Sequence, residues 1–222
     1  MSEKVGRLAE VHLGKPGLPR GPHRLPPAKV RRMQRERLVR AALSTVADVG
    51  YGSTTVREIV RRAGVSLKAF YEHFDDKQDC LLTAIAESMQ VLPRHLGDPA
   101  GATAEERLRS VFRRPLEFFA AEPEVARAFH LELRAAGPEG RTLYFTVLRV
   151  FAGVIREWHE RESPEAAALV PPELYRAAAG GSEQLVTELI DAGRTDGLPE
   201  LAQVCAGLTL GMLSPWARSA RS

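Results

Sequence analysis

Residues 53–77 read Ser-Thr-Thr-Val-Arg-Glu-Ile-Val-Arg-Arg-Ala-Gly-Val-Ser-Leu-Lys-Ala-Phe-Tyr-Glu-His-Phe-Asp-Asp-Lys, and they predict two short helices joined by a tight turn. Thr55 and Glu58 have the spacing of a capping box, in which a hydroxyl and a carboxylate each satisfy a free amide at a helix start. Gly64 suits a left-handed turn residue, and Ser66 is placed to cap the second helix. The stretch therefore favours a helix-turn-helix.

The second helix of this motif carries the surface that is expected to meet DNA. Phe70 and Phe74 lie four residues apart and are expected to point inward together. The residues expected to face outward are Leu67, Lys68, Ala69, Tyr71 and His73. Such a surface fits a major groove about 12 Å wide, where the second helix of the motif reads base edges.

Basic charge is concentrated in the part of the chain that holds this motif. The 222 residues have a net charge of +3, but residues 20–80 contain 13 Lys and Arg against 7 Asp and Glu, whereas residues 81–222 contain 15 against 19. Lys and Arg that neutralise phosphates release condensed counterions, so this asymmetry indicates a polyanionic partner. A basic face that is merely solvated remains the alternative.

Apolar spacing elsewhere is helical, and no run of strict alternation bounded by turns indicates a strand. The sequence therefore predicts an all-α fold of about nine helices. Outside the motif they are expected near residues 29–49, 76–93, 103–121, 124–136, 138–161, 173–192 and 198–216. Pro115 is expected to kink or divide one of them, and Pro164 is expected to mark a loop.

Three segments are expected along the chain. Glycine and proline fill 8 of the 14 positions from 14 to 27, so residues 1–27 are expected to be a flexible arm. Residues 28–85 are expected to form the helix-turn-helix domain. Residues 86–222 are expected to form a helical regulatory and dimerisation domain.

The runs Thr-Thr-Val-Arg-Glu-Ile (54–59), Ala-Gly-Val-Ser (63–66) and Phe-Tyr-Glu-His-Phe-Asp-Asp-Lys (70–77) resemble the DNA-binding domain of the TetR family of bacterial transcriptional regulators. The resemblance covers about residues 29–85, and beyond residue 90 it is one of layout. It implies a homodimer that binds double-stranded DNA at a palindromic operator. It further implies a repressor that is released when a small, largely apolar effector binds the C-terminal domain.

The resemblance also implies roles for individual residues of the motif. Thr54 and Thr55 match positions that cap the first helix and reach a phosphate. Phosphate contacts are further implied for Tyr71, for His73 and for Lys77, which matches a lysine that anchors to the DNA backbone.

Base reading is expected mainly from Leu67, Lys68 and Ala69. Lys68 stands where many members of the family have a small residue, and it is open whether this lysine reads guanine or binds phosphate. Arg31 and Arg32 are expected to touch the backbone or the minor groove, with an idle solvated face as the alternative.

Aromatic and aliphatic residues in the middle of the chain are candidates for a ligand pocket. They are Phe112, Leu116, Phe119, Phe129, His130, Leu133, Tyr144, Leu148 and Phe151. The resemblance implies a pocket, in which His130 and Tyr144 would orient the ligand, whereas the residues alone fit a plain core equally well.

The last two helices are candidates for a dimer interface. The apolar positions concerned are Leu185, Leu189, Leu201, Val204 and Leu208. In a monomer they would form a buried hairpin. The resemblance and the short reach of one recognition helix both favour a dimer.

Several other classes of function find little support. The histidines have no i, i+4 pair, so no metal or cofactor is expected, and no catalytic constellation stands out. Cys80 and Cys205 are too far apart in sequence to indicate a disulfide scaffold, which favours a cytoplasmic protein. The ten-residue apolar run 204–213 is too short to span a bilayer, so no membrane association is expected.

Two rival interpretations stay open. The first is an all-α enzyme, for which His130 and Glu132 are the best candidate residues. The second is a helical adaptor that binds another protein.

Overall fold

The computed structural model describes residues 26–96 and 99–219, and these residues contain helices and no strand. Its ten α-helices are α2 (Pro27–Ser53), α3 (Val56–Ala63), α4 (Leu67–Tyr71), α5 (Lys77–Leu96), α6 (Ala104–Ala121), α7 (Pro123–Arg127), α8 (Gly137–Glu162), α9 (Pro164–Leu169), α10 (Pro172–Asp191) and α11 (Leu201–Ser219). Three further turns are η1 (Ala128–Glu132, a π-helix), η2 (Leu133–Ala135) and η3 (Thr195–Glu200). The predicted all-α fold is confirmed.

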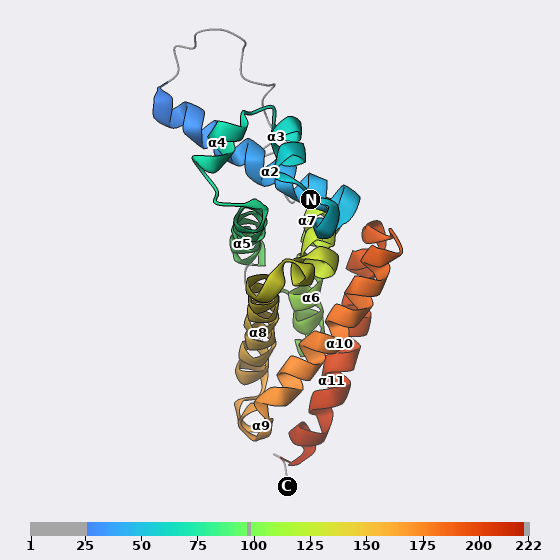
Figure 1. Cartoon of the computed structure of the whole chain (residues 1–222). Coiled ribbons are helices and arrows are strands. Elements are labelled where there is room, and N and C mark those ends of the chain that lie inside the picture. Colours follow the sequence, from blue (N-terminus) through green and yellow to red (C-terminus); the bar gives the residue numbers. More distant parts are fainter. Residues whose placement is uncertain (1–25, 97–98, 220–222) are drawn as a thin grey trace.

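The helices form a head and a longer lower bundle (Figure 1). The head consists of α2, α3 and α4, and α5 leads from it into the bundle. In the bundle α10 and α11 run against each other along one edge, and α8 packs on α10.

Two clusters of buried apolar residues underlie this division. The head cluster comprises Leu38, Ala41, Ala42, Ile59, Ala63, Phe70, Phe74 and Cys80. The larger cluster fills the bundle and also takes Leu43 and Val46 from α2 and Leu81 and Ile85 from α5. Because α2 and α5 each contribute to both clusters, the head is tied to the bundle by two shared helices.

Some of the predicted helix boundaries are wrong. Helix α6 is not divided at Pro115, and residues 124–136 form a sequence of α, π and 3₁₀ turns instead of one helix. Pro164 begins α9 where a loop was expected. Proline at the first position of a helix loses no intrahelical bond, since its amide would be unpaired there anyway.

The predicted arm falls largely outside the described residues, apart from Pro26 and Pro27, which begin α2. Among the residues described, no helix has the length and hydropathy needed to cross a bilayer. Cys80 and Cys205 are both buried thiols, and burial raises the pKa of Cys80 to about 12.

Candidate DNA-binding surface and ligand pocket

A tight elbow joins α3 and α4, as the motif predicts. The hydroxyl of Thr55 accepts a hydrogen bond from the Glu58 amide at 3.2 Å, which begins α3. Gly64 ends α3 with φ 60° and ψ 42°, the left-handed conformation that glycine adopts without strain. Ser66 Oγ accepts from the Ala69 amide at 3.1 Å and begins α4.

Helix α4 presents a partly apolar surface to solvent. Phe70 and Phe74 are buried with their ring centroids 5.7 Å apart, as predicted. Tyr71 and Leu67 are 57% and 44% exposed, and Lys68 is also exposed. The prediction that Ala69 faces outward is wrong, because its side chain is 6% exposed and lies beside Phe70 on the inner side of a five-residue helix.

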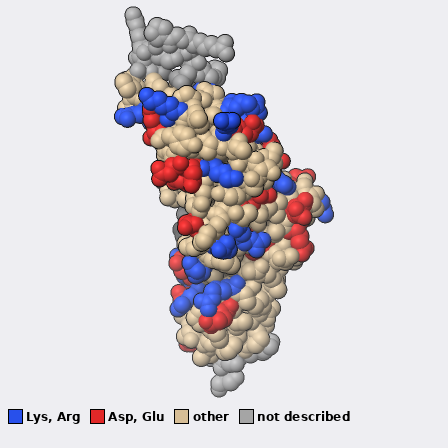
Figure 2. Space-filling model, in the orientation of Figure 1, with Lys and Arg blue, Asp and Glu red and all other residues tan. Residues whose placement is uncertain are grey.

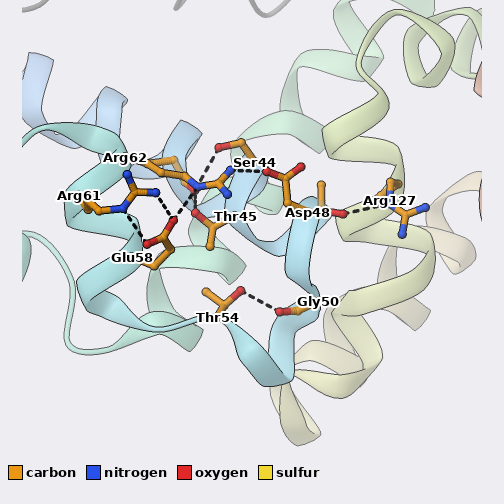
Figure 3. A network of polar contacts seen from close by, with 11 residues as sticks. Ser44, Thr45, Asp48, Gly50, Thr54, Glu58, Arg61, Arg62 and Arg127 are labelled. Carbon is orange, nitrogen blue, oxygen red and sulfur yellow. Dashed lines mark hydrogen bonds and ion pairs between the residues drawn. The ribbon is translucent and has the colours of Figure 1, made fainter.

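Most of the charge on α3 is engaged within the chain (Figure 3). Glu58 accepts hydrogen bonds from Arg61 and Arg62, which hold the pKa of its carboxyl at about 2. Arg62 also reaches Asp48 of α2. The Glu58 carboxylate therefore binds two arginines in the network of Figure 3. Of the two hydrogen bonds in the expected capping box, the one accepted by the Thr55 hydroxyl is formed.

Thr54 and His73 are less available to DNA than the sequence implied. Thr54 is buried, and its hydroxyl donates to the Gly50 carbonyl at 2.8 Å, so it closes the end of α2 and does not cap α3. The Nε2 atom of His73 is buried, and burial lowers the pKa of this histidine, which disfavours the cation a phosphate would select.

Lys77 also has a structural role that the sequence did not reveal. Its ammonium donates to the carbonyls of Tyr51 at 2.9 Å, Thr54 at 2.8 Å and Gly52 at 3.4 Å. An ammonium has three N–H donors, so these three carbonyls use its capacity. The expected contact of Lys77 with the DNA backbone is therefore not supported by its geometry; the residue instead secures the end of α2.

Substituting Lys77 tests this structural role. We expect Lys77→Ala to lower the free energy of unfolding by about 2 kcal/mol, because three hydrogen bonds from a charged donor to backbone carbonyls at the end of α2 are lost. Chemical denaturation measures the change. The matched control is Lys68→Ala, which removes an exposed ammonium and is expected to change stability by less than about 0.5 kcal/mol. Equal stabilities, with a smaller salt dependence of DNA binding for Lys77→Ala, would contradict the structural role.

Basic residues also lie on the outer part of α2. Arg31 and Arg32 are exposed there, and Arg32 lies 3.6 Å from Glu36 in an ion pair one turn away. Figure 2 shows Lys and Arg side chains on the head beside acidic ones, so this view has no uniformly basic face. The cations that could contact DNA on this face are therefore separate side chains and not a continuous basic patch.

A largely apolar pocket lies in the bundle between α6, η1, α8, α10 and α11. Seven of the predicted residues line it, namely Phe112, Leu116, Phe119, Phe129, His130, Leu148 and Phe151. Lining residues that the prediction missed are Pro115, Val147, Ala179, Ser182, Glu183, Val186 and Cys205. The cavity has a volume of about 80 Å³.

Two of the predicted pocket residues lie elsewhere. Leu133 is fully buried in the bundle core and does not line the cavity. Tyr144 stands behind the wall, where its hydroxyl donates to Glu183 Oε1 at 2.9 Å. The sequence did not predict Glu183 as a pocket residue. Its spacing is nevertheless a signal: it lies four positions after Ala179 and three before Val186, both buried, so a polar group is expected to face inward there.

The turn η1 joins the pocket to the head. It carries Phe129 and His130 into the pocket wall, whereas Glu132 at its end accepts a hydrogen bond from the Tyr51 amide at 2.8 Å. Just before it, Arg127 donates to the Ala47 carbonyl at 3.1 Å (Figure 3). His130 and Glu132 therefore have separate partners and do not form the pair that a catalytic interpretation would need.

The edge formed by α10 and α11 leaves apolar side chains exposed. Val204 is 55% and Leu208 39% exposed. Leu185, Leu189 and Leu201 are half-buried and pack against the bundle core. Open space adjoins Gly207, where an added Cβ would meet nothing within 4 Å.

Comparison with known proteins gives consistent similarities. Residues 38–84 match the family model described as bacterial regulatory proteins, tetR family. The fatty acid metabolism regulator protein of Bacillus subtilis is 29% identical over 57% of this chain and 66% of its own length, and the class C tetracycline repressor protein of Escherichia coli is 43% identical over 26% of each. The matched part is thus under two thirds of either relative.

A solved structure shares the fold over a larger part of the chain. The transcriptional regulator FadR from Bacillus subtilis, in complex with stearoyl-CoA, superposes with a TM-score of 0.69 at 24% identity, covering 79% of this chain and 97% of that one. At this identity the likeness establishes a common fold.

Proposed function

We propose that the chain, whose residues 38–84 match the tetR family of bacterial regulatory proteins, belongs to that family and is a sequence-specific DNA-binding regulator of transcription acting in the cytoplasm. The observation that carries the proposal is the elbow at Gly64, which exposes Leu67, Lys68 and Tyr71 on α4 while Phe70 and Phe74 anchor that helix. Residues 28–85 would then form the DNA-binding domain and residues 86–222 the regulatory domain.

We assign the DNA contacts to the side chains of the motif and of α2 that are exposed. Leu67, Lys68 and Tyr71 are exposed, so we assign base contacts to the first two and a phosphate contact to the Tyr71 hydroxyl. Thr55 is exposed at the start of α3, and Arg31 and Arg32 are exposed on α2; these are assigned to phosphates. Ala69, which is buried, would help by packing α4 against the rest of the head.

The proposed effector is a molecule with a long apolar chain. The FadR structure contains stearoyl-CoA, and the pocket here is lined mainly by aromatic and aliphatic groups. Pockets for drug-sized ligands are typically about 300–1,000 Å³, whereas this cavity is about 80 Å³. A long ligand must therefore move the pocket walls, and η1 would pass that movement to the head through Arg127 and Glu132. Release of DNA, and thus relief of repression, would follow from this coupling.

The proposed assembly is a homodimer joined through α10 and α11. Support comes from the exposed apolar residues Val204 and Leu208 on this edge. Two heads related by two-fold symmetry would bind a palindromic operator. The alternative is a monomer in which α10 and α11 are simply a packed hairpin.

Selection of bound sequences from a random DNA pool tests the proposed function. We expect the full-length chain to enrich a palindrome, and we expect Lys68→Ala to change the preference at one position in each half-site, since a lysine that reads a base contributes about 1–3 kcal/mol of discrimination.

The matched control for this selection is Arg156→Ala, which removes a charge from the exposed face of α8 and should leave the selected sequence unchanged. A uniform loss of affinity for Lys68→Ala would make Lys68 a phosphate contact. Failure to bind any duplex with salt-dependent affinity would refute the regulator and favour the protein-binding adaptor.

A further inference from the structure

The pocket wall contains one buried polar group among its aromatic residues. The His130 ring packs edge-on against Phe119 and Phe129, with centroids 4.6 and 4.8 Å away. Its side chain is 2% exposed, and its Nδ1 atom lies 2.8 Å from Glu183 Oε1. These contacts fix the plane and the position of the imidazole, so any ligand that enters the pocket meets it in one orientation.

The partners of Glu183 determine which nitrogen of His130 carries a proton. Glu183 Oε1 also accepts from the Tyr144 hydroxyl at 2.9 Å and from the Thr187 hydroxyl at 3.2 Å. Burial and the neighbouring Glu183 carboxylate raise the pKa of Tyr144, so this phenol remains a donor. An oxygen that accepts from two hydroxyls is an acceptor for Nδ1 as well. Neutral His130 therefore carries its proton on Nδ1 and a lone pair on Nε2.

That lone pair has no partner within the described part of the chain. Nε2 of His130 is buried without a hydrogen bond to any described residue, although His130 lines the cavity. A buried acceptor without a partner is unfavourable, and a ligand that supplies a donor removes this deficit. An ester, a thioester or an ether contains acceptor atoms alone and leaves it in place.

We propose that the effector is an apolar chain carrying an O–H group, a long-chain alcohol or a free fatty acid, which donates a hydrogen bond to His130 Nε2. The proposal rests on the proposed function in that it takes the pocket as the effector site. Glu183 is a positioning residue in this scheme, because it fixes the tautomer of His130 from behind. Acyl chains whose head group is an ester or a thioester would bind more weakly.

Two pairs of isomers test the donor requirement by calorimetric titration of the full-length protein. Decan-1-ol and 1-methoxynonane share one molecular formula, as do decanoic acid and methyl nonanoate, and each pair differs in having an O–H donor. We expect decan-1-ol to bind at least about tenfold more tightly than 1-methoxynonane. Decanoic acid should bind in its protonated form, so its affinity relative to methyl nonanoate should rise about tenfold for each unit by which the pH is lowered from 7. At pH 7 the acid should also take up about one proton on binding, seen as a buffer-dependent enthalpy, whereas the alcohol should not.

Variants connect this preference to the two side chains. His130→Phe keeps the ring but removes Nε2, so the preference for decan-1-ol should fall to about twofold or less. Glu183→Gln can donate to Nδ1 and allow the other tautomer, so it should reduce the preference as well. The matched control is His159→Phe: His159 is also buried, but its Nδ1 lies 2.9 Å from the Tyr175 hydroxyl and it does not line the cavity. The preference should survive in this control.

A measurement on the unmodified protein covers the case in which a pocket variant does not fold. The ¹⁵N chemical shift of His130 Nε2 should be that of an unprotonated nitrogen without ligand and should move when decan-1-ol is added. Equal binding of decan-1-ol and 1-methoxynonane, binding of neither, or a protonated Nε2 in the neutral ring would overturn the inference. Selection of a palindrome by the same preparation would leave the regulator standing after such a failure, whereas loss of all DNA binding refutes the regulator whatever the isomers do.

Discussion

Gly140→Ala is expected to lower the free energy of unfolding by about 3 kcal/mol or more. A Cβ at Gly140 would lie 2.2 Å from the Leu133 carbonyl oxygen and 3.1 Å from Ala136 Cβ, so helix α8 could not remain packed on η2 without a backbone shift. Thermal or denaturant unfolding measures the loss. The same shift would displace η2, which directly follows the turn that carries His130.

Gly153→Ala is the matched control, since Gly153 lies in the interior of the same helix and an added Cβ meets nothing within 4 Å. There the gain in helix propensity should stabilise the protein by about 0.5–1 kcal/mol. The two alanines thus have opposite expected signs on one helix. Similar effects at both positions would show that α8 does not approach η2 as closely as described.

The helix-turn-helix could be predicted from sequence because its determinants are local. The hydroxyls of Thr55 and Ser66 accept from amides three residues later, and Gly64 turns the chain through its own left-handed backbone conformation. The burial of Phe70 and Phe74 follows from helical spacing alone. Such short-range rules do not depend on the remainder of the chain.

Contacts between distant segments could not be predicted in the same way. Lys77 binds carbonyls 23 to 26 positions earlier, and no sequence pattern distinguishes that role from a phosphate contact. The hydrogen bond of Glu132 to the Tyr51 amide spans 81 positions. Glu183 meets His130 across 53 positions, so its part in the pocket depends on how α10 packs against η1.

The π-helical turn η1 explains how one short segment serves both the pocket and the head. An extra residue in a helical turn changes the direction of the side chains that follow it, and such turns are frequent at functional sites. Phe129 and His130 line the pocket, while Glu132, two residues later, reaches the end of α2. A ligand that displaces the first pair therefore acts on a segment in direct contact with the head.

Disrupting the proposed dimer is expected to have the largest effect on operator binding. We expect the double substitution Val204→Asp and Leu208→Asp to convert the protein to a monomer, because two carboxylates would have to be buried without partners in the interface. Two linked heads bind about 10²–10⁴-fold more tightly than one, so operator affinity should fall by about that factor. Analytical ultracentrifugation measures the mass, and fluorescence anisotropy with a labelled operator measures the affinity.

Val150→Asp is the matched control for this prediction. Val150 is 62% exposed, more than Val204 or Leu208, but it lies on α8 and belongs to neither α10 nor α11. The control should remain dimeric and keep its operator affinity within about threefold, since a charge on a solvated face changes little. If the double variant stayed dimeric, the interface would lie elsewhere. If it became monomeric with unchanged affinity, one head would suffice for the operator, and the symmetry argument for a palindrome would fail with it.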